Sequence, residues 1–193
     1  CIAAMNTDEA LSYGLSGPLL RSCGVEYDVR RARPYWVYDE MDFDVVTRDE
    51  GDVYARFLVR MNEMRESVKI ISQALDRLPG GPVNIDDWKI VLPEKAAVYT
   101  QMESLITHFK LIMKGHGLKT PKRGKIYSCT ESPNGELGWY IETDGSAVGY
   151  RVRCRPPSYI NYSGMPQMVN GGYIADVVAC LSSLNVIAGE LDR

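Results

Sequence analysis

The sequence predicts an α+β fold with long antiparallel helices, a small antiparallel β-meander and a buried C-terminal helix. Residues 52–78 and 94–114 repeat apolar side chains at intervals of three and four, which is typical of amphipathic helices. Residues 124–155 change to the alternation of antiparallel strands, and residues 171–189 are apolar around most of a helical circumference. We therefore divide the whole stretch into a mainly helical part, a β-meander and a C-terminal helical segment, over residues 1–123, 124–160 and 161–193.

The first long helix is expected over residues 52–78. Asp52 is placed to cap its start, and "PGGP" from Pro79 ends it. One face carries the charged residues Arg56, Arg60, Glu63, Glu66 and Arg77. The opposite stripe is interpreted as core, and it consists of Val53, Phe57, Met61, Met64, Val68, Ile71, Leu75 and Leu78.

A second long helix is expected over residues 94–114, directly after Pro93. Val98, Met102, Leu105 and the apolar residues after them repeat the helical spacing. The link from Pro79 to Leu92 is long enough for the two helices to pack as an antiparallel pair.

Three strands are expected over residues 124–132, 136–143 and 147–155, because "PNGE" and "TDGS" contain dipeptides that favour hairpins. Arg151, Arg153 and Arg155 share one face of the third strand. Two interpretations stay open for this row, a solvated face of the sheet or a cationic wall for an acidic partner or a polar head group. The apolar stretch over 171–189 predicts a helix buried between layers.

Composition and motifs exclude several classes of protein. The chain has 45% apolar and 24% charged residues and a net charge of -3, so nothing indicates a nucleic-acid partner. No apolar run reaches the roughly 20 residues that span a bilayer. Five cysteines without C-x-x-C spacing and the separate His108 and His116 predict buried free thiols and no metal site. No phosphate-binding loop and no nucleophile elbow are present.

Four long motifs carry a family resemblance. In order they are "SGPLLRSCGVEYDVRR", "RPYWVYDEMDFDV", "ESPNGELGWYIETDGSAVGYRVRCRPPSYIN" and "DVVACLSSLNVIAGELDR". Together they resemble the C-terminal half of the D subunit of respiratory complex I, the NADH–quinone oxidoreductase. That family is similar in turn to the large subunit of nickel–iron hydrogenases, so the resemblance implies a hydrogenase-like fold. Cys1 opens the sequence without methionine, and we expect a part of a longer chain.

The resemblance also implies a function. Hydrogenases end with cysteines that bind their metal centre, whereas this chain ends with "AGELDR", so the corresponding cavity is expected to hold the head group of a quinone. It implies that this chain binds no cofactor and that quinone is the substrate. It further implies a small iron–sulfur subunit that donates electrons, other complex I subunits as partners, and an indirect link to the membrane arm. The protein is then one part of a proton-translocating enzyme and is not catalytic alone. Its expected place is peripheral, on the cytoplasmic face of the inner membrane, or on the matrix side in a mitochondrion.

The resemblance places part of the quinone chamber in the proline-bearing loop and the terminal segment. The candidates are Arg155, Pro156, Ser158, Tyr159, Asn185, Val186, Ile187, Asp192 and Arg193. No catalytic residue is assigned, because the family's histidine and tyrosine that face the quinone lie in its N-terminal half. Family members usually have glycine at the positions of Ser22 and Ser158, aspartate at Asn185 and an aromatic residue at Ala188.

Two other functions stay open. The chain could be a non-catalytic scaffold or assembly relative that keeps the fold without electron transfer. It could also be a relative of membrane-bound hydrogenases, which the lack of terminal cysteines disfavours. Each candidate residue also has a purely structural interpretation, in which Asp192 and Arg193 stabilise the terminal helix or contact a neighbouring protein of the complex.

Overall fold

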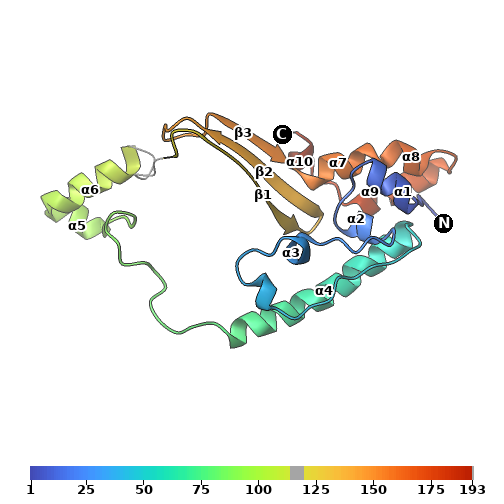
Figure 1. The fold of residues 1–193 in the computed structure, drawn as a ribbon, viewed down its shortest axis with the longest axis horizontal. Helices are drawn as coiled ribbons and strands as arrows, with labels where there is room; N and C mark the ends of the chain where they lie inside the picture. The colour runs from blue at the N-terminus through green and yellow to red at the C-terminus, as the bar shows by residue number, and fades with distance from the viewer. Residues whose placement is uncertain (114–119, 193) are drawn as a thin grey trace. The chain divides into compact units, whose positions relative to one another are not determined.

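The computed structural model describes residues 1–113 and 120–192, which form two compact units (Figure 1). The second unit contains Pro79–Tyr127 and Tyr140–Arg153. The first unit contains Cys1–Leu78, Ser128–Trp139 and the described residues from Cys154 onward. The α+β class is confirmed. The division at residues 123 and 160 follows chain order, and it stays a prediction.

The core of the first unit is built from segments that are far apart in the sequence. Figure 1 shows the blue helices α1 (Thr7–Ser12) and α2 (Pro18–Arg21) beside the orange and red α7 (Pro157–Ser163), α8 (Met165–Val169) and α9 (Ile174–Leu184). Burial of apolar surface between these helices stabilises the unit. The buried cluster comprises Met5, Ala10, Leu15, Leu19, Leu20, Cys23, Met168, Cys180 and Leu184.

Three short helices complete the first unit. They are α3 (Val29–Ala32), the 3-10 helix η1 (Tyr38–Glu40) and α10 (Ala188–Leu191). Asp28 caps α3, because its side chain accepts a hydrogen bond from the Arg30 amide.

The long helix α4 spans Val53–Asp76, close to the predicted bounds. The Asp52 carboxylate accepts a hydrogen bond from the Ala55 amide at 2.8 Å, which confirms the predicted cap. The interpretation of its apolar stripe as core is wrong. From Phe57 to Leu78 the stripe residues are exposed, with fractions from 38% at Met61 to 73% at Leu78.

The inward face of α4 carries polar side chains opposite backbone amides and carbonyls, in addition to two buried apolar residues. Arg56 is 0% exposed, and its Nη2 donates to the Ala3 and Gly51 carbonyls at 2.7 and 2.9 Å. Gln73 donates to the Asp42 carbonyl at 2.7 Å and accepts from the Asp42 amide at 2.9 Å. Polar side chains satisfy these backbone groups, which an apolar face would leave unpaired.

The second unit contains α5 (Lys95–Thr100) and α6 (Met102–Met113) in place of one continuous helix. Gln101 between them is extended, with φ -124° and ψ 125°. The Thr100 hydroxyl donates to the Ala96 carbonyl at 2.9 Å, a bond that bends helices, and β-branched residues have modest helix propensity. The two long helices belong to different units, so their antiparallel pairing stays a prediction.

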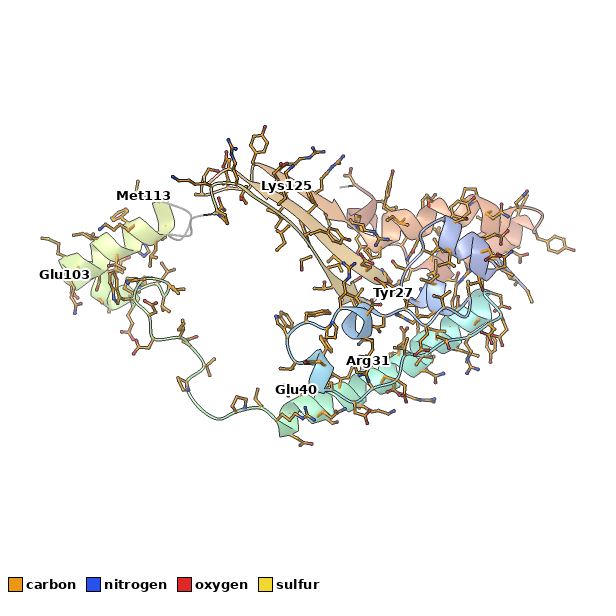
Figure 2. The ribbon with its side chains drawn as sticks, viewed as in Figure 1. Tyr27, Arg31, Glu40, Glu103, Met113 and Lys125 are labelled. Carbon is orange, nitrogen blue, oxygen red and sulfur yellow. The ribbon has the colours of Figure 1, made fainter. Side chains whose placement is uncertain are left out.

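The antiparallel sheet has the order β1–β2–β3, and its strands contribute to both units (Figure 1). Strands β1 (Gly124–Ser132) and β2 (Gly135–Thr143) match the prediction closely. Strand β3 (Arg151–Arg155) begins later than expected. In the second unit Lys125, labelled in Figure 2, pairs with Glu142 across β1 and β2 at 3.0 Å.

The predicted full burial of the C-terminal helix is wrong. Cys180, Ser183 and Leu184 of α9 are buried, but Ile174 and Val178 are 90% and 70% exposed. The helix packs against α4, α7 and α8 within the described chain, and these contacts leave Ile174 and Val178 uncovered. No helix among residues 1–113 and 120–192 is long and apolar enough to cross a membrane.

Candidate functional site

A hydrogen-bonded pair of asparagines, the buried Asn134 and the exposed Asn185, lies in the first unit, where the turn between β1 and β2 meets the end of α9. Asn134 is 2% exposed, and its Nδ2 donates to the Asn185 carbonyl at 3.0 Å. Asn185 Nδ2 donates in return to Asn134 Oδ1 at 2.8 Å. The reciprocal bonds join residues that are far apart in the sequence, so they hold the turn and the terminal segment together.

The first turn of α7 extends this polar cluster. Ser158 is 0% exposed, and its amide donates to Glu190 Oε2 at 3.0 Å. Its hydroxyl lies 3.5 Å from both Asn134 Nδ2 and the Ile187 amide. Asn161, also 0% exposed, donates to the Asn134 carbonyl at 3.0 Å. The cluster therefore orients residues 185–187 through side chains that are themselves held in place.

Asn185 ends α9 in the left-handed conformation, with φ 52° and ψ 49°. Asparagine tolerates this conformation better than most residues, because its short polar side chain bonds locally. The chain reverses at this point and leads to Val186 and Ile187.

Three cavities of the first unit share Asn185 in their lining. Their volumes are about 600, 430 and 460 Å³. Phe57, Met61 and Met64 form an apolar wall of the first, and Val186 lines the third. An amide beside apolar walls is typical of sites that bind small, largely apolar molecules.

A buried ion-pair network lines the first of these cavities, whose volume is about 600 Å³. Arg21 is 2% exposed and donates to Glu63 at 2.7 Å through Nε and to Glu131 at 2.8 Å through Nη1. Burial lowers the pKa of Arg21, but Glu131 and Glu63 raise it by more. Burial raises the pKa of both carboxyls above the ordinary value, although Arg21 lowers them. Tyr27, labelled in Figure 2, borders the network and donates to Glu136 at 3.1 Å. Burial and that neighbouring carboxylate raise its pKa to about 12.

Arg155 lines none of the three cavities that Asn185 lines. Its guanidinium joins two backbone segments instead. Its Nη1 donates to the Glu136 carbonyl at 3.0 Å, and its Nη2 donates to the Gly14 carbonyl at 3.3 Å. Arg151 and Arg153, by contrast, are exposed. The three arginines of the predicted row therefore differ in their surroundings, because only Arg155 is held by backbone carbonyls.

The remaining candidates have different surroundings. Pro156 is buried directly before α7, whereas Tyr159 and Ile187 are 46% and 49% exposed. Asp192 is exposed, and Arg193 lies outside the described residues. The structure therefore joins Ser158, Asn185 and Ile187 through hydrogen bonds and places Val186 beside Asn185 in one cavity.

Sequence reasoning missed Asn134, Asn161, Arg21 and Glu131. The motif "ESPNGE" pointed only to a turn, and a turn asparagine is ordinarily exposed. No local signal indicates that Asn134 is buried, because its partners come from α7 and α9.

The described residues contain no group of three His, Cys, Asp or Glu side chains that could hold a metal ion. All five cysteines are free, but the prediction of buried thiols holds only for Cys23 and Cys180, and burial raises the pKa of both. Cys129 and Cys154 are half-buried, and Cys1 is exposed. A raised thiol pKa is the reverse of what a metal-binding thiolate requires. His108 packs edge-on against Phe109, and His116 lies outside the described residues.

Comparison with known proteins decides the family. Residues 1–193 match the family described as the 49 kDa subunit of respiratory-chain NADH dehydrogenase. The chain belongs to this family. The resemblance to the complex I D subunit that the motifs carried is thereby confirmed.

Bacterial relatives agree with this assignment. The chain is 43% identical to the D subunit of NADH-quinone oxidoreductase from Myxococcus xanthus, over 98% of this chain and 45% of the relative. It is 49% identical to the first of the numbered D subunits of Sorangium cellulosum, over 100% of this chain and 47% of the relative. It is also 48% identical to the C/D subunit of Bdellovibrio bacteriovorus, over 100% of this chain and 34% of the relative. The chain thus spans less than half the length of these relatives.

Proposed function

We propose that this chain is part of the quinone-binding, peripheral-arm subunit of a proton-translocating NADH–quinone oxidoreductase. It helps to form the quinone chamber, beside an iron–sulfur cluster that a small partner protein of the complex holds. The chain binds no redox cofactor of its own, and quinone is the substrate. Its fold is of the nickel–iron hydrogenase large-subunit type.

One observation carries the proposal: Asn185 opens onto three cavities while the buried Asn134 fixes its side chain. A quinone head group is a planar apolar ring with carbonyl acceptors, so it needs apolar walls and a few oriented polar groups. The cavity of about 460 Å³ offers Val186, Leu181 and Leu191 as apolar walls beside the Asn185 amide. Residues 185–187 belong to the segment that the family resemblance associates with the chamber.

The role of this segment is positioning and exclusion of water. Ser158 and Asn134 bond the backbone of Ile187 and Asn185, so the wall of the cavity is held before substrate arrives. Other complex I subunits, including those of the membrane arm, complete the environment. The protein then works peripherally, at the cytoplasmic face of the inner membrane or its matrix equivalent.

A narrowing variant tests the proposal in the purified native complex. Val186→Trp fills part of the cavity beside Asn185, and we expect the KM for quinone to rise at least about tenfold. Electron transfer from NADH to a soluble artificial acceptor should stay unchanged, because it does not use the chamber. Val83→Trp, at a position that is 99% exposed, is the matched control.

Two results would contradict the proposal. An unchanged KM for quinone in Val186→Trp would show that this cavity is not part of the quinone chamber. Purification of the native protein without an iron–sulfur subunit, without iron and without quinone reductase activity would leave the alternative, a non-catalytic scaffold or assembly relative.

A further inference from the structure

The side-chain amide of Asn134 has one orientation that satisfies its hydrogen bonds. Its Nδ2 lies 3.0 Å from the Asn185 carbonyl oxygen, which accepts hydrogen bonds and cannot donate them. The reversed amide would place the acceptor Oδ1 against that carbonyl, in a residue that is 2% exposed and has no water to turn to. Asn134 Oδ1 therefore faces the Asn185 side chain at 2.8 Å, and position 185 has to provide a donor.

The surroundings of Asn134 hold it in this place. Asn161 Nδ2 donates to the Asn134 carbonyl at 3.0 Å, and Ser158 Oγ lies 3.5 Å from Asn134 Nδ2. Asn161 is fixed in turn, because its Oδ1 accepts from the Ser16 amide at 3.2 Å. Ser158 and Asn161 are both 0% exposed. This buried network opposes any rearrangement that would relieve an unfavourable neighbour at position 185.

The orientation of Asn185 follows from that of Asn134. One N–H of Asn185 Nδ2 is bonded to Asn134 Oδ1, whereas the second N–H and Oδ1 bond no residue in the described part of the chain. Asn185 is exposed and lines the three cavities. Its amide therefore has one donor and one acceptor left for a ligand, and it carries no charge.

We propose that Asn134 is a positioning residue that requires a hydrogen-bond donor at position 185, and that the neutral Asn185 amide lets the site bind both redox states of the quinone. A quinone carbonyl only accepts hydrogen bonds, whereas a hydroquinone hydroxyl also donates them, so the free N–H and Oδ1 complement the two states in turn. An ionised carboxylate at position 185 would repel both Asn134 Oδ1 and a quinone carbonyl. The statement about quinone rests on the proposed function, but the requirement for a donor does not.

Charged and titratable groups surround Asn185 on several elements. Those that line the same cavities or bond the neighbouring Ser158 are Arg21, Arg30, Arg60, Glu63, Glu131, Tyr162 and Glu190. All of them are present in wild type as well as in a variant of position 185. A pH dependence that appears only in Asn185→Asp is therefore assigned to the introduced carboxyl.

The variant Asn185→Asp tests the requirement for a donor in the purified native complex. The protonated carboxyl can donate to Asn134 Oδ1 as the amide does, but the ionised carboxylate cannot, so its pKa should lie above the ordinary aspartate value of about 3.9. Stability relative to wild type is then lost as the pH rises through this raised pKa. From about pH 5 to about pH 8, we expect hydrogen-exchange protection at the end of α9 to fall about tenfold relative to wild type, which corresponds to one lost hydrogen bond. The exposed Asn170→Asp is the matched control and should show no such fall.

A double variant assigns the effect to Asn134. In the background of Asn134→Leu, the change Asn185→Asp should lose most of its pH dependence, because no oxygen then faces the carboxyl. Protection in Asn185→Asp that follows wild type at every pH would overturn the requirement for a donor. An equal fall with and without Asn134 would overturn it too.

The KM for quinone tests the second half of the proposal. From about pH 5 to about pH 8, we expect this KM to rise about tenfold more in Asn185→Asp than in wild type, while electron transfer from NADH to a soluble artificial acceptor stays unchanged. A KM that follows wild type in Asn185→Asp, although Val186→Trp raises it, would overturn this role of Asn185 and leave the proposed chamber intact. A KM that is unchanged in both variants would contradict the chamber as well.

Discussion

Replacing Arg21 by methionine removes the centre of a buried network while keeping most of the side-chain volume. The Arg21 side chain is 3% exposed, and the Glu131 side chain that it contacts at 2.8 Å is 6% exposed. Glu63, at 2.7 Å, is 19% exposed and can regain water more easily. The variant therefore leaves chiefly Glu131 buried without its counter-charge.

The expected loss of stability follows from the Glu131 carboxylate, which stays buried without its counter-charge. Breaking a buried ion pair by removing one partner costs about 3–5 kcal/mol. At about 1.4 kcal/mol per tenfold change, this corresponds to a loss of about 10²- to 10⁴-fold in the equilibrium for opening the first unit. An exposed pair such as Lys69–Glu66, with Lys69 at 54%, is screened by solvent and contributes far less.

Native-state hydrogen exchange in the purified complex measures this difference, because buried amides report the free energy of local opening. We expect amide protection in α2 to fall strongly in Arg21→Met and little in the control Lys69→Met. Adding Glu131→Gln to Arg21→Met should recover part of the loss, since it removes the stranded charge. Equal losses in Arg21→Met and Lys69→Met would refute the reasoning.

Three further predictions concern the same unit. Gly17→Ala should destabilise it by more than about 1 kcal/mol, because φ is +67° and an added Cβ would lie 2.4 Å from the Gly135 Cα; Gly80→Ala, with open space around it, is the control in thermal unfolding of the complex. Burial raises the pKa of Asp28, but the hydrogen bond and charge of Arg30 lower it by more, so its net pKa is below the ordinary value. Asp28 thus stabilises the fold above its unfolded pKa of about 3.9, and the stability gap between wild type and Asp28→Asn should close as the pH falls through the folded pKa. A gap that is constant across pH would contradict this origin. Asn185→Val should cost about 1–2 kcal/mol of backbone strain at φ 52°, more than Asn185→Gly, in the same unfolding measurement; equal costs would show that the lost amide dominates.

Local signals predicted the elements that depend on neighbouring residues. The start of α4 at Val53 follows from the Asp52 cap, and β1 follows from alternation and the turn after it. The break at Gln101 was missed, because apolar spacing continues across it while the Thr100 side chain bends the chain.

Local signals could not predict which face of α4 is buried, nor which residues contact Asn134. An amphipathic helix shows which face is apolar, but not whether the described chain supplies the surface that covers it. The Asn134–Asn185 pair depends on contacts between β1–β2 and the end of α9, which no local pattern encodes. The family resemblance placed Asn185 and Ser158 among the candidates, but not Asn134, which bonds both.

The polar underside of α4 also changes how substitutions in this helix should be judged. Gln73 exchanges two hydrogen bonds with the backbone of Asp42, and Glu66 accepts one from the Asp44 amide. Hydrogen bonds depend on direction, so these bonds fix the rotation of the helix about its own axis. Hydrophobic contacts alone would leave that rotation adjustable. A change from Gln73 to leucine adds hydrophobic surface, yet it would remove both bonds to Asp42 and leave the helix free to rotate about its axis. In this helix, tolerance to mutation is expected to follow hydrogen-bonding capacity on the inside and apolar character on the outside.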